Sequence, residues 1–449
     1  MSARVRRPEG PVLAEPVSTT RPEADRFAEA LRPGRMGPRL ADAVGAVAAA
    51  GGAARTCHVL DAKYEPGVRA TVLYELAGRL LRGDLLPVAD PGARRVGPLG
   101  DPVVAPGIRV SAFPHDPELP ILPELVDPAR LGPALAEATG ASAIGVRCRT
   151  TLLRYRPGKR ATLRVGFVGR PDRYVAKAYH DPVKAAAVAE EAPALSGHAE
   201  RCATLRIPPA VAHLREQGVV VQRAVSGVPL DALLGRSLST AGGVRAATEA
   251  VARAGRALAE LHAMPPATTR RRSVDDELDR FGRRAAGIAG LDPRLGAALA
   301  GLSERLRDAQ ASLPAAVAGT VHGDCKPSQF LLDGPHAVLL DLDHVGVSDQ
   351  AVDVGTFLAS LRQLAQRPTG SASERSARSG ALSALATAFL RSYLETWGGD
   401  TILPRIRWQE AVALERKALR AWARAPGSPT AGRLVREANT CLDRLTQTP

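Results

Sequence analysis

Residues 321–357 read VHGDCKPSQFLLDGPHAVLLDLDHVGVSDQAVDVGTF. Two short apolar runs, Phe330–Leu332 and Ala337–Leu340, are separated by turn-forming residues, a pattern that predicts a β-hairpin. Asp324 precedes the first run and Asp341 follows the second. Because antiparallel strands return the chain to the edge where it began, we expect both carboxylates at one end of the hairpin. Such a pair could supply a metal ligand and a base.

The composition is that of a globular protein of two or three domains: 449 residues, 45% hydrophobic and 24% charged. The formal charge is +14, but the arginines are spread among acidic residues. Aromatic residues make up only 4%, too few for a base-stacking platform, so we expect no nucleic-acid partner. Nothing in the sequence indicates an oligomeric state.

The five cysteines form no Cys-x-x-Cys pair, which predicts a reducing compartment and no disulfide framework. No run approaches the roughly 20 apolar residues of a membrane span, so no membrane partner is expected. The basic N-terminus is followed by Pro and Glu rather than by the apolar stretch of a signal peptide. We therefore expect a cytoplasmic protein.

The sequence contains an internal duplication. Cys57–Leu76 and Cys148–Phe167 share the pattern Tyr-x-Pro-Gly-x-Arg-Ala-Thr, and their first cysteines are 148 − 57 = 91 residues apart. The same offset, without a gap, relates Arg39 to Arg130. Each copy is therefore predicted to be a helix followed by a β-hairpin, the first helix covering about Pro38–Ala50.

The two copies differ after the hairpin. In the second copy Lys177 lies within an apolar run, Tyr174–Tyr179, that predicts a strand. At the same offset the first copy has Leu86. A lysine inside an apolar strand costs free energy unless it has a charged partner or a ligand. We therefore interpret the second copy as functional and the first as structural.

The features around and after the second copy follow a definite order. Lys177 on a strand precedes Glu191 on a helix, then a strand leading into a linker, several helices, and the motifs HGD-x-x-x-x-Q and LLDLD. This order resembles the aminoglycoside phosphotransferase family, the small-molecule kinase branch of the protein-kinase-like fold, over about residues 130–422. The resemblance implies an α+β, bilobal fold with an antiparallel-sheet N-lobe and a mainly helical C-lobe. An N-terminal module would duplicate the helix and hairpin of the N-lobe.

The resemblance also divides the chain into domains. Residues 1–35, rich in Pro and Arg without an apolar period, are expected to be a disordered tail. Residues 36–128 are expected to hold the degenerate repeat and a Pro- and Gly-rich linker. The nucleotide-binding N-lobe is expected over residues 129–224, and the helical C-lobe with the catalytic loop and substrate site over residues 225–449.

The resemblance implies ATP and Mg²⁺ as cofactors. Lys177 would bind the α- and β-phosphates of ATP, and Glu191 would hold Lys177 in a buried ion pair. Glu190 is the neighbouring alternative for this ion pair. The nucleotide site would be completed by residues of the hairpin turn and of the strand before the linker: Gly158, Lys159, Gln222 and Ala224.

The catalytic roles carried over from the family fall in the quoted stretch. Asp324 would accept a proton from the substrate hydroxyl or orient it, and Lys326 could neutralise the γ-phosphate. Asp341 would ligate Mg²⁺, which prefers hard oxygen ligands, with Asp343 assisting. Gln329 stands where the family usually has Asn as second metal ligand; its amide oxygen reaches one methylene further.

Two further residues are interpreted as scaffold rather than as catalysts. His322 is expected to be hydrogen-bonded within the loop, and Asp353 to accept backbone N–H bonds around it. Because Lys177, Asp324 and Asp341 are present together, the sequence predicts an ATP- and Mg²⁺-dependent phosphotransferase acting on a small-molecule hydroxyl. The alternative is a catalytically weak, nucleotide-binding or regulatory kinase-like protein.

The substrate is expected to be a sugar or another metabolite rather than an aminoglycoside. Aminoglycosides are polycations that favour an acidic cleft, whereas the region from Ala381 onward carries more Arg and Lys than Asp and Glu. Sugar-directed relatives such as the maltokinases resemble this chain in having Gln at the position of Gln329.

Overall fold

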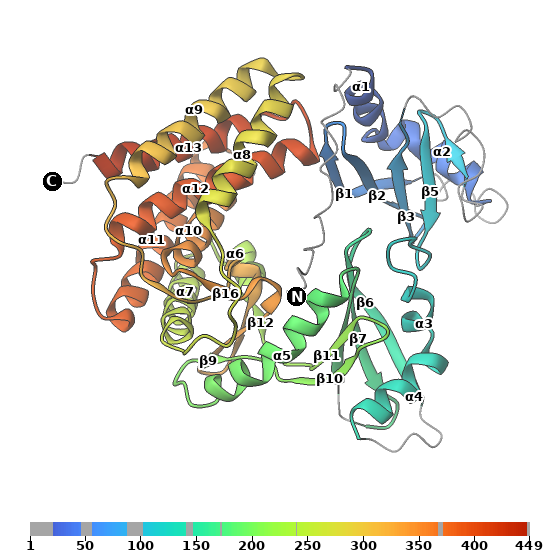
Figure 1. The fold of residues 1–449 in the computed structure, drawn as a ribbon, viewed down its shortest axis with the longest axis horizontal. Helices are drawn as coiled ribbons and strands as arrows, with labels where there is room; N and C mark the ends of the chain where they lie inside the picture. Colours follow the sequence, from blue (N-terminus) through green and yellow to red (C-terminus); the bar gives the residue numbers. More distant parts are fainter. Residues whose placement is uncertain are drawn as a thin grey trace, which may run out of the picture. The chain divides into compact units, whose positions relative to one another are not determined.

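The computed structural model describes residues 21–45, 56–87, 102–140, 147–170, 173–238, 240–366 and 371–446. These residues form two compact units, which we describe separately. The first unit contains the described residues up to Ser111 together with Arg284–Gly296 and Ala423–Gly427. The second contains Ala112–Arg283, Ala297–Trp422 and the described residues from Ser428 onward. Figure 1 draws the helices and strands and labels many of them.

The first unit is built on a sheet with the strand order β1-β2-β3-β5-β4. Its elements are α1 (Arg21–Ala30), α2 (Pro33–Ala43), β1 (Cys57–Glu65), β2 (Arg69–Leu76), β3 (Arg79–Leu85), β4 (Val103–Val104) and β5 (Ile108–Ala112). Phe27 of α1 stacks on Tyr64 of β1, with ring centroids 4.7 Å apart. Tyr74 of β2 donates a hydrogen bond to the carbonyl oxygen of Ala30 (2.8 Å). These contacts bury the apolar side of α1 against the sheet.

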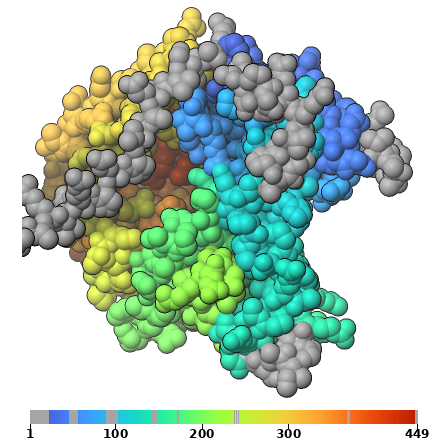
Figure 2. Space-filling view, turned by 45° about the vertical axis from the view of Figure 1, so that its right-hand side comes forward, coloured from blue at the N-terminus to red at the C-terminus, as the bar shows by residue number. Residues whose placement is uncertain are grey.

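The second unit begins with a sheet of the order β6-β7-β8-β11-β10. The elements of this region are α3 (Leu122–Val126), α4 (Pro128–Ala138), β6 (Cys148–Arg156), β7 (Arg160–Phe167), β8 (Arg173–Tyr179), α5 (Pro182–Ala199), β9 (Leu205–Arg206), β10 (Ala210–Leu214) and β11 (Val219–Arg223). On the face drawn in Figure 2, the teal part of the chain lies beside green segments of the same unit, and α3 and α4 contact β6. The strand order repeats that of the first unit, so the duplication extends to five strands.

The two hairpins correspond closely. β1 and β6 have nine residues each, and β2 and β7 have eight. Gly67 and Gly158 in the two turns have φ of +68° and +64°, values that glycine adopts without strain. The predicted offset of 91 is therefore confirmed for the hairpins.

The helices before the hairpins correspond at another offset. α2 begins at Pro33 and α4 at Pro128, both have 11 residues, and 128 − 33 = 95. Their buried residues pair at this same offset: Met36 with Leu131, Gly37 with Gly132, Leu40 with Leu135, and Ala41 with Ala136. The prediction that the offset of 91 continues into the helix is wrong. α2 ends at Ala43, and residues 46–50 of the predicted helix lie outside the described residues.

The third strands correspond at yet another offset. Lys177 in β8 pairs with Thr162, and the equivalent Thr71 pairs with Asp84 in β3, so the offset is 177 − 84 = 93. The predicted match of Lys177 with Leu86 is therefore wrong, since β3 ends at Leu85. At the position of the lysine the first copy has a carboxylate, which accepts a hydrogen bond from Thr71 (2.7 Å).

The rest of the second unit is mainly helical. Its elements are β12 (Val228–Pro229), α6 (Leu230–Ser237), α7 (Ala241–His262), α8 (Val274–Ala289), α9 (Pro293–Gln310), β13 (Ala318–Val321), η4 (Pro327–Gln329), β14 (Phe330–Asp333), β15 (His336–Leu339), η5 (Leu342–His344), β16 (Gly346–Asp349), α10 (Ala351–Ala365), α11 (Ala372–Trp397), α12 (Leu403–Arg424) and α13 (Pro429–Thr446). Residues 284–296 within α8 and α9 and residues 423–424 of α12 belong to the first unit. Phe357 of α10 stacks on Phe389 of α11 with ring centroids 3.8 Å apart, at the centre of the apolar core.

The expected α+β class, with a sheet followed by a mainly helical region, is confirmed. The expected disordered tail over residues 1–35 is wrong in part, because α1 and the start of α2 lie within it; residues 1–20 are outside the described residues. Part of the expected linker, residues 122–126, forms α3 in the second unit. No helix within the described ranges is long and apolar enough to cross a membrane. All five cysteines are free thiols.

Candidate functional site

The loop between β13 and β14 carries the HGD sequence. Gly323 has φ of +77°, and a Cβ at this position would overlap the carbonyl oxygen of His344, so glycine is required. Asp353, in the first turn of α10, accepts hydrogen bonds from the backbone N–H groups of His322 (2.6 Å) and Gly323 (2.8 Å). These bonds fix the loop in the shape that presents Asp324.

His322 and Asp353 are scaffold residues, as expected. His322 Nε2 donates to the carbonyl oxygen of Leu340 (2.8 Å), which ties the loop to the end of β15. Asp353 is fully buried and accepts a hydrogen bond from His262 Nε2 (3.2 Å). Burial alone would raise the pKa of Asp353, but the hydrogen bond from His262 and the charges around it hold it below the usual range. Asp353 is thus a buried anion that organises the loop.

The predicted hairpin is confirmed. β14 and β15 are antiparallel, with Phe330 opposite Leu339. The N–H of Leu340 donates to the carbonyl oxygen of Gln329 (2.8 Å), so the residues before β14 and after β15 lie at one end of the hairpin. Asp341 follows at this end with φ of +64°, an uncommon conformation for a residue with a side chain.

Two carboxylates after the hairpin meet two cations of the sheet. Lys177 Nζ lies 2.6 Å from Asp341 Oδ1 and 2.5 Å from Asp343 Oδ1. Arg160 donates from both terminal nitrogens to Asp341 (3.1 and 3.0 Å) and from Nη1 to Asp343. The hydroxyl of Tyr179 donates to Asp343 Oδ1 (2.7 Å). β7 and β8 are neighbouring strands, so their pairing brings both cations to the same two carboxylates.

Burial sets the electrostatics of this cluster. It lowers the pKa of Lys177 to about 7, against the opposing effect of Asp341. Burial alone would raise the pKa of Asp341, but Lys177 and Arg160 hold it well below the usual range. The carboxylate of Asp341 is therefore ionised at neutral pH and available to a cation.

The donor set fits a hard metal ion. Gln329 is buried, and its Nε2 donates to Asp341 Oδ2 (3.1 Å), so rotation of the amide would turn its oxygen toward the same space. Asp343 forms ion pairs with Lys177 and Arg160, the same two cations that pair with Asp341. Within the described ranges, no three His, Cys, Asp or Glu side chains form a self-sufficient metal site. Mg²⁺ typically takes only one or two carboxylates together with phosphate oxygens, so these residues fit it.

Glu191 does not pair with Lys177, and that prediction is wrong. Glu191 is buried on α5, and its carboxylate lies 2.5 Å from Arg270 Nη2, which also donates to the carbonyl oxygen of Val345 (3.0 Å). Glu190, the alternative, is exposed. Because Asp341 and Asp343 already balance the ammonium of Lys177, α5 supplies no carboxylate to it.

The turn predicted to cover the nucleotide is held from an adjacent segment. Asp116 Oδ2 accepts hydrogen bonds from the Tyr155 hydroxyl (2.7 Å) and from the N–H of Gly158 (2.7 Å). Lys159 follows in the turn, and its N–H donates to the carbonyl oxygen of Arg156 (3.0 Å). A carboxylate with two donors thus fixes the turn between β6 and β7.

Gln222 and Ala224 lie at the end of β11. Gln222 pairs with Val175 of β8, and the N–H of Ala224 donates to the carbonyl oxygen of Arg173 (2.9 Å). The contacts described above therefore bring together four of the predicted site residues: Lys177, Gln329, Asp341 and Asp343. Gly158 and Lys159 lie in the turn between β6 and β7, whereas Gln222 and Ala224 lie in and just after β11, which neighbours β8 in the same sheet.

Asp324 belongs to a second charged group. It forms an ion pair with Lys326, and Arg420 Nη1 of α12 lies 3.9 Å from Asp324 Oδ1. Burial alone would raise the pKa of Asp324, but Lys326 and Arg420 hold it well below the usual range. Asp324 is accordingly a permanent anion near neutral pH.

Sequence reasoning missed the roles of four cluster residues. Arg160 had a signal, because it belongs to the Arg-Ala-Thr pattern present in both copies. The sequence carries no signal for Lys184 of α5, which lies 3.9 Å from Asp343 Oδ2, because lysines on helices are common. It carries none for Tyr179 either, because tyrosines in strands are common. Arg420 is 420 − 324 = 96 residues from Asp324, and only the fold brings it near.

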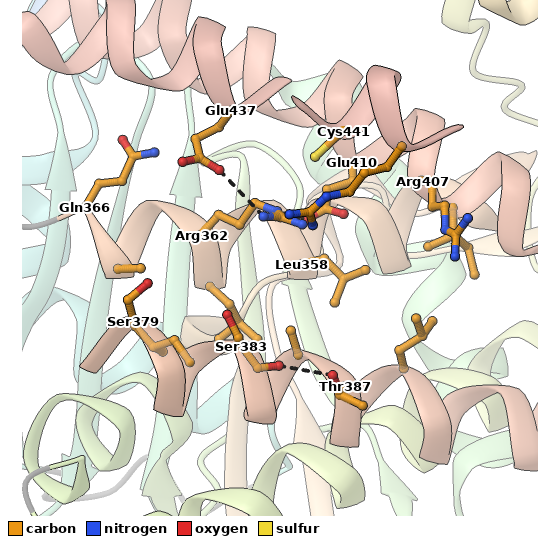
Figure 3. A pocket seen from close by; sticks show the side chains of 17 residues that line it. Leu358, Arg362, Gln366, Ser379, Ser383, Thr387, Arg407, Glu410, Glu437 and Cys441 are labelled. Atoms are coloured by element: carbon orange, nitrogen blue, oxygen red, sulfur yellow. Dashed lines mark hydrogen bonds and ion pairs between the residues drawn. The ribbon is translucent and has the colours of Figure 1, made fainter. Parts of the chain in front are cut away.

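A cavity of about 690 Å³ lies elsewhere in the helical part of the second unit. Residues of α10, α11, α12 and α13 line it, and the described lining includes none of the predicted site residues. Figure 3 shows Arg362 facing Glu437. The two side chains form an ion pair of 3.5 Å, and Arg362 also pairs with Glu410. Because its described lining holds none of the predicted site residues, we assign the cavity no part in phosphate chemistry.

Solved structures similar to this chain share little sequence with it. One is a choline/ethanolamine kinase family protein from Mesorhizobium loti, with 17% identity over 70% of this chain and 95% of that chain, and a TM-score of 0.45. Another is a thermostable mutant of aminoglycoside phosphotransferase APH(4)-Ia in complex with ADP and hygromycin B. It shares 15% identity over 71% of this chain and 99% of that chain, with a TM-score of 0.47. A third is the amicoumacin kinase hAmiN in complex with AMP-PNP, Ca²⁺ and Ami. It shares 13% identity over 66% of this chain and 88% of that chain, with a TM-score of 0.44.

No curated protein matches the chain. The model of the phosphotransferase enzyme family matches residues 157–401, that is 245 of the 449 residues. The matched region includes the turn after β6, the sheet cations, the HGD loop and both carboxylates after the hairpin. This match confirms the resemblance seen in the sequence and, with the architecture above, the expected kinase-like fold. The chain belongs to the phosphotransferase enzyme family.

Proposed function

We propose that this phosphotransferase moves the γ-phosphate of ATP to a hydroxyl group of a small molecule, with Mg²⁺ as the metal. The observation that carries the proposal is the cluster in which Lys177 Nζ contacts both Asp341 (2.6 Å) and Asp343 (2.5 Å), with Gln329 hydrogen-bonded to Asp341. A nearly buried lysine beside two carboxylates suits the binding of phosphate together with a divalent metal.

The sheet cations would bind the phosphates. Lys177 and Arg160 are both nearly buried, so each is an almost desolvated donor whose hydrogen bonds to phosphate oxygens are strong. Asp341, Asp343 and Gln329 would hold Mg²⁺, which supplies charge neutralisation to the phosphate oxygens. When the nucleotide binds, Arg160 exchanges contacts with carboxylates for contacts with phosphate.

Asp324 would orient the acceptor hydroxyl. Since Lys326 and Arg420 hold its pKa well below the usual range, Asp324 is a weak base in the free protein. Phosphoryl transfer has a loose transition state that needs little proton removal before the bond to phosphorus forms. Asp324 therefore acts first as a hydrogen-bond acceptor for the hydroxyl and takes its proton late, while Lys326 neutralises the transferred group.

For the acceptor we propose a sugar or another metabolite in preference to an aminoglycoside. The support is the basic character around Asp324, where Lys326 and Arg420 are its ion-pair partners. A polycationic aminoglycoside would be repelled by this surrounding. In keeping with its free cysteines, we propose that the protein works in the cytoplasm.

The proposal is tested by measuring nucleotide binding and transfer together. Calorimetric titration of the full chain with AMP-PNP and Mg²⁺ is expected to give binding that Lys177→Met weakens at least tenfold, because the variant loses a charged hydrogen bond to phosphate. ATP plus an acceptor panel is then expected to release ADP in an acceptor-dependent way. Binding without acceptor-dependent ADP release would favour a nucleotide-binding regulatory protein instead.

A further inference from the structure

Every carboxylate oxygen of Asp341 and Asp343 accepts a hydrogen bond from another side chain. Arg160 donates to both oxygens of Asp341 and to Oδ2 of Asp343. Lys177 donates to Oδ1 of both residues, at 2.6 and 2.5 Å. Arg160 therefore contacts three of the four oxygens that a metal ion held by these two carboxylates would use.

The contacts of Arg160 with the carboxylates are shielded from solvent. The side chains of Arg160 and Asp341 are 10% and 13% accessible, and that of Asp343 is fully buried. Charges in such surroundings are screened little, so the guanidinium repels a second cation at the same oxygens. Moving Arg160 away without offering it another anion would leave a buried charge uncompensated, which is costly. A divalent metal ion alone therefore meets both the repulsion and the cost of displacement.

One donor of Arg160 is not used by the carboxylates. Its Nε is buried and has no hydrogen-bond partner among the described residues. A buried N–H group without an acceptor is unfavourable, and an oxygen atom of a ligand would satisfy it. Arg160 is the first residue of β7 and directly follows the turn, residues 157–159, that is predicted to cover the nucleotide. Phosphate oxygens of the nucleotide would supply both an acceptor for Nε and the anion that the displaced guanidinium needs.

We propose that Arg160 is the internal counter-ion of Asp341 and Asp343 and makes metal binding depend on the nucleotide. Without nucleotide, Arg160 stays on the two carboxylates and opposes the binding of a divalent cation. When phosphates bind, Arg160 transfers to them and leaves the carboxylates to act as metal ligands. The coupling is reciprocal, so a metal ion on the carboxylates likewise favours the contact of Arg160 with phosphate. This inference rests on the proposed function and adds a control of the same site.

The test measures the binding of Mn²⁺ to the full chain in the absence of nucleotide. Mn²⁺ is paramagnetic and prefers the same oxygen ligands as Mg²⁺, so the electron paramagnetic resonance signal of the free ion gives its affinity. Arg160→Gln should bind Mn²⁺ about tenfold more tightly than the wild type, or better, an effect within the usual range of coupling between sites. Adding Asp341→Asn to this variant should abolish the gain, because it removes a carboxylate of the site.

Arg164→Gln is the matched control, because Arg164 is an exposed arginine of the same strand whose replacement changes the net charge equally. It should bind Mn²⁺ as the wild type does. Arg160→Lys keeps the charge but loses the planar, two-pronged contact with Asp341, so its Mn²⁺ affinity should lie between those of the wild type and Arg160→Gln. Urea denaturation checks that each variant folds, and Arg160→Lys carries the comparison if Arg160→Gln does not.

Two outcomes overturn the inference: the folded Arg160 variants bind Mn²⁺ no more tightly than the wild type, or Arg164→Gln shows the same gain. If calorimetry shows that the wild type does not bind AMP-PNP with Mg²⁺, the proposed function fails. If the wild type binds AMP-PNP but the Arg160 variants gain no affinity for Mn²⁺, only the coupling through Arg160 is wrong.

Discussion

At the scale of single residues, Arg160 is the side chain that links the sheet to the carboxylates. It contacts Asp341 through both terminal nitrogens and is only 10% exposed. We expect Arg160→Gln to raise the KM for ATP roughly tenfold or more, because a charged donor to phosphate is lost. Steady-state kinetics at varied ATP would measure this change.

The first copy offers the control for that variant. Arg69 stands at the equivalent position of β2 and donates to Thr71 (3.1 Å). Arg69→Gln should leave the KM for ATP unchanged. If both variants change the KM equally, Arg160 acts through general charge rather than through phosphate contact.

Glu415 predicts a pH dependence of stability. It is fully buried on α12, accepts a hydrogen bond from Ser303 Oγ (2.5 Å), and burial raises its pKa to about 7. Between pH 4.5 and pH 7 the folded state therefore binds more protons than the unfolded state, and stability falls as pH rises through this window. Above pH 7 the loss of stability is complete, and the full shift of the pKa corresponds to about 3 kcal/mol.

Glu415→Gln keeps the side-chain shape and removes the titration. The free energy of unfolding of the variant minus that of the wild type should be greater at pH 8 than at pH 4.5, by roughly 2 to 3 kcal/mol. Urea denaturation of both proteins at the two pH values measures this difference. Parallel stability profiles would show that Glu415 is not the titrating group.

Several site residues could be predicted from sequence because their chemistry is local. Asp324 and Asp341 are placed by a hairpin whose turn and apolar runs are contiguous, and Lys177 stands out inside an apolar strand. The partner of Lys177 could not be predicted in the same way. Glu191 was expected from a shared helix face, but the choice between partners depends on the tertiary distances to Asp341 and Arg270.

At the scale of elements, the turn between β6 and β7 depends on Asp116. Its carboxylate joins the turn to Tyr155 through two hydrogen bonds of 2.7 Å. Asp116→Ala should loosen the turn and weaken AMP-PNP binding several-fold, while the loss of two charge-assisted bonds lowers stability by about 2 kcal/mol. Calorimetry and urea denaturation would separate the two effects.

A carboxylate holds the equivalent turn of the first copy as well. Glu23 Oε1 accepts a hydrogen bond from the N–H of Gly67 (3.2 Å). Glu23→Ala is therefore the matched control: it should affect stability but leave AMP-PNP affinity unchanged. A loss of affinity in this variant would contradict the assignment of nucleotide binding to the second copy alone.

The errors in aligning the two copies have a physical cause. Relative to the hairpins, the helices are displaced by 95 − 91 = 4 residues, which is close to one helical turn. The third strands are displaced by 93 − 91 = 2 residues, which equals the side-chain period of a strand. Shifts of this size keep buried residues on the buried face. The hydrophobic pattern therefore does not detect these shifts. The buried residues of the helices reveal the first, and the pairing of the strands reveals the second.

At the scale of the whole chain, two sheets with the same strand order carry different charges. The position of Lys177 in the second sheet is occupied in the first by Asp84, which is paired with Arg82 (2.6 Å). A carboxylate there repels a triphosphate. We expect one AMP-PNP molecule per chain in calorimetric titration; two sites of similar affinity would show that the first copy is functional too.

The central claim is that the chain transfers phosphate to a small molecule with Asp324 at the acceptor. The most direct measurement incubates the full chain with γ-³²P-ATP and a mixture of small metabolites, and follows the label by chromatography. The wild type should produce a labelled small molecule other than inorganic phosphate, and Asp324→Asn should reduce its formation by at least a hundredfold while still binding AMP-PNP. Equal labelling by both proteins, or label found only in inorganic phosphate, would contradict the account.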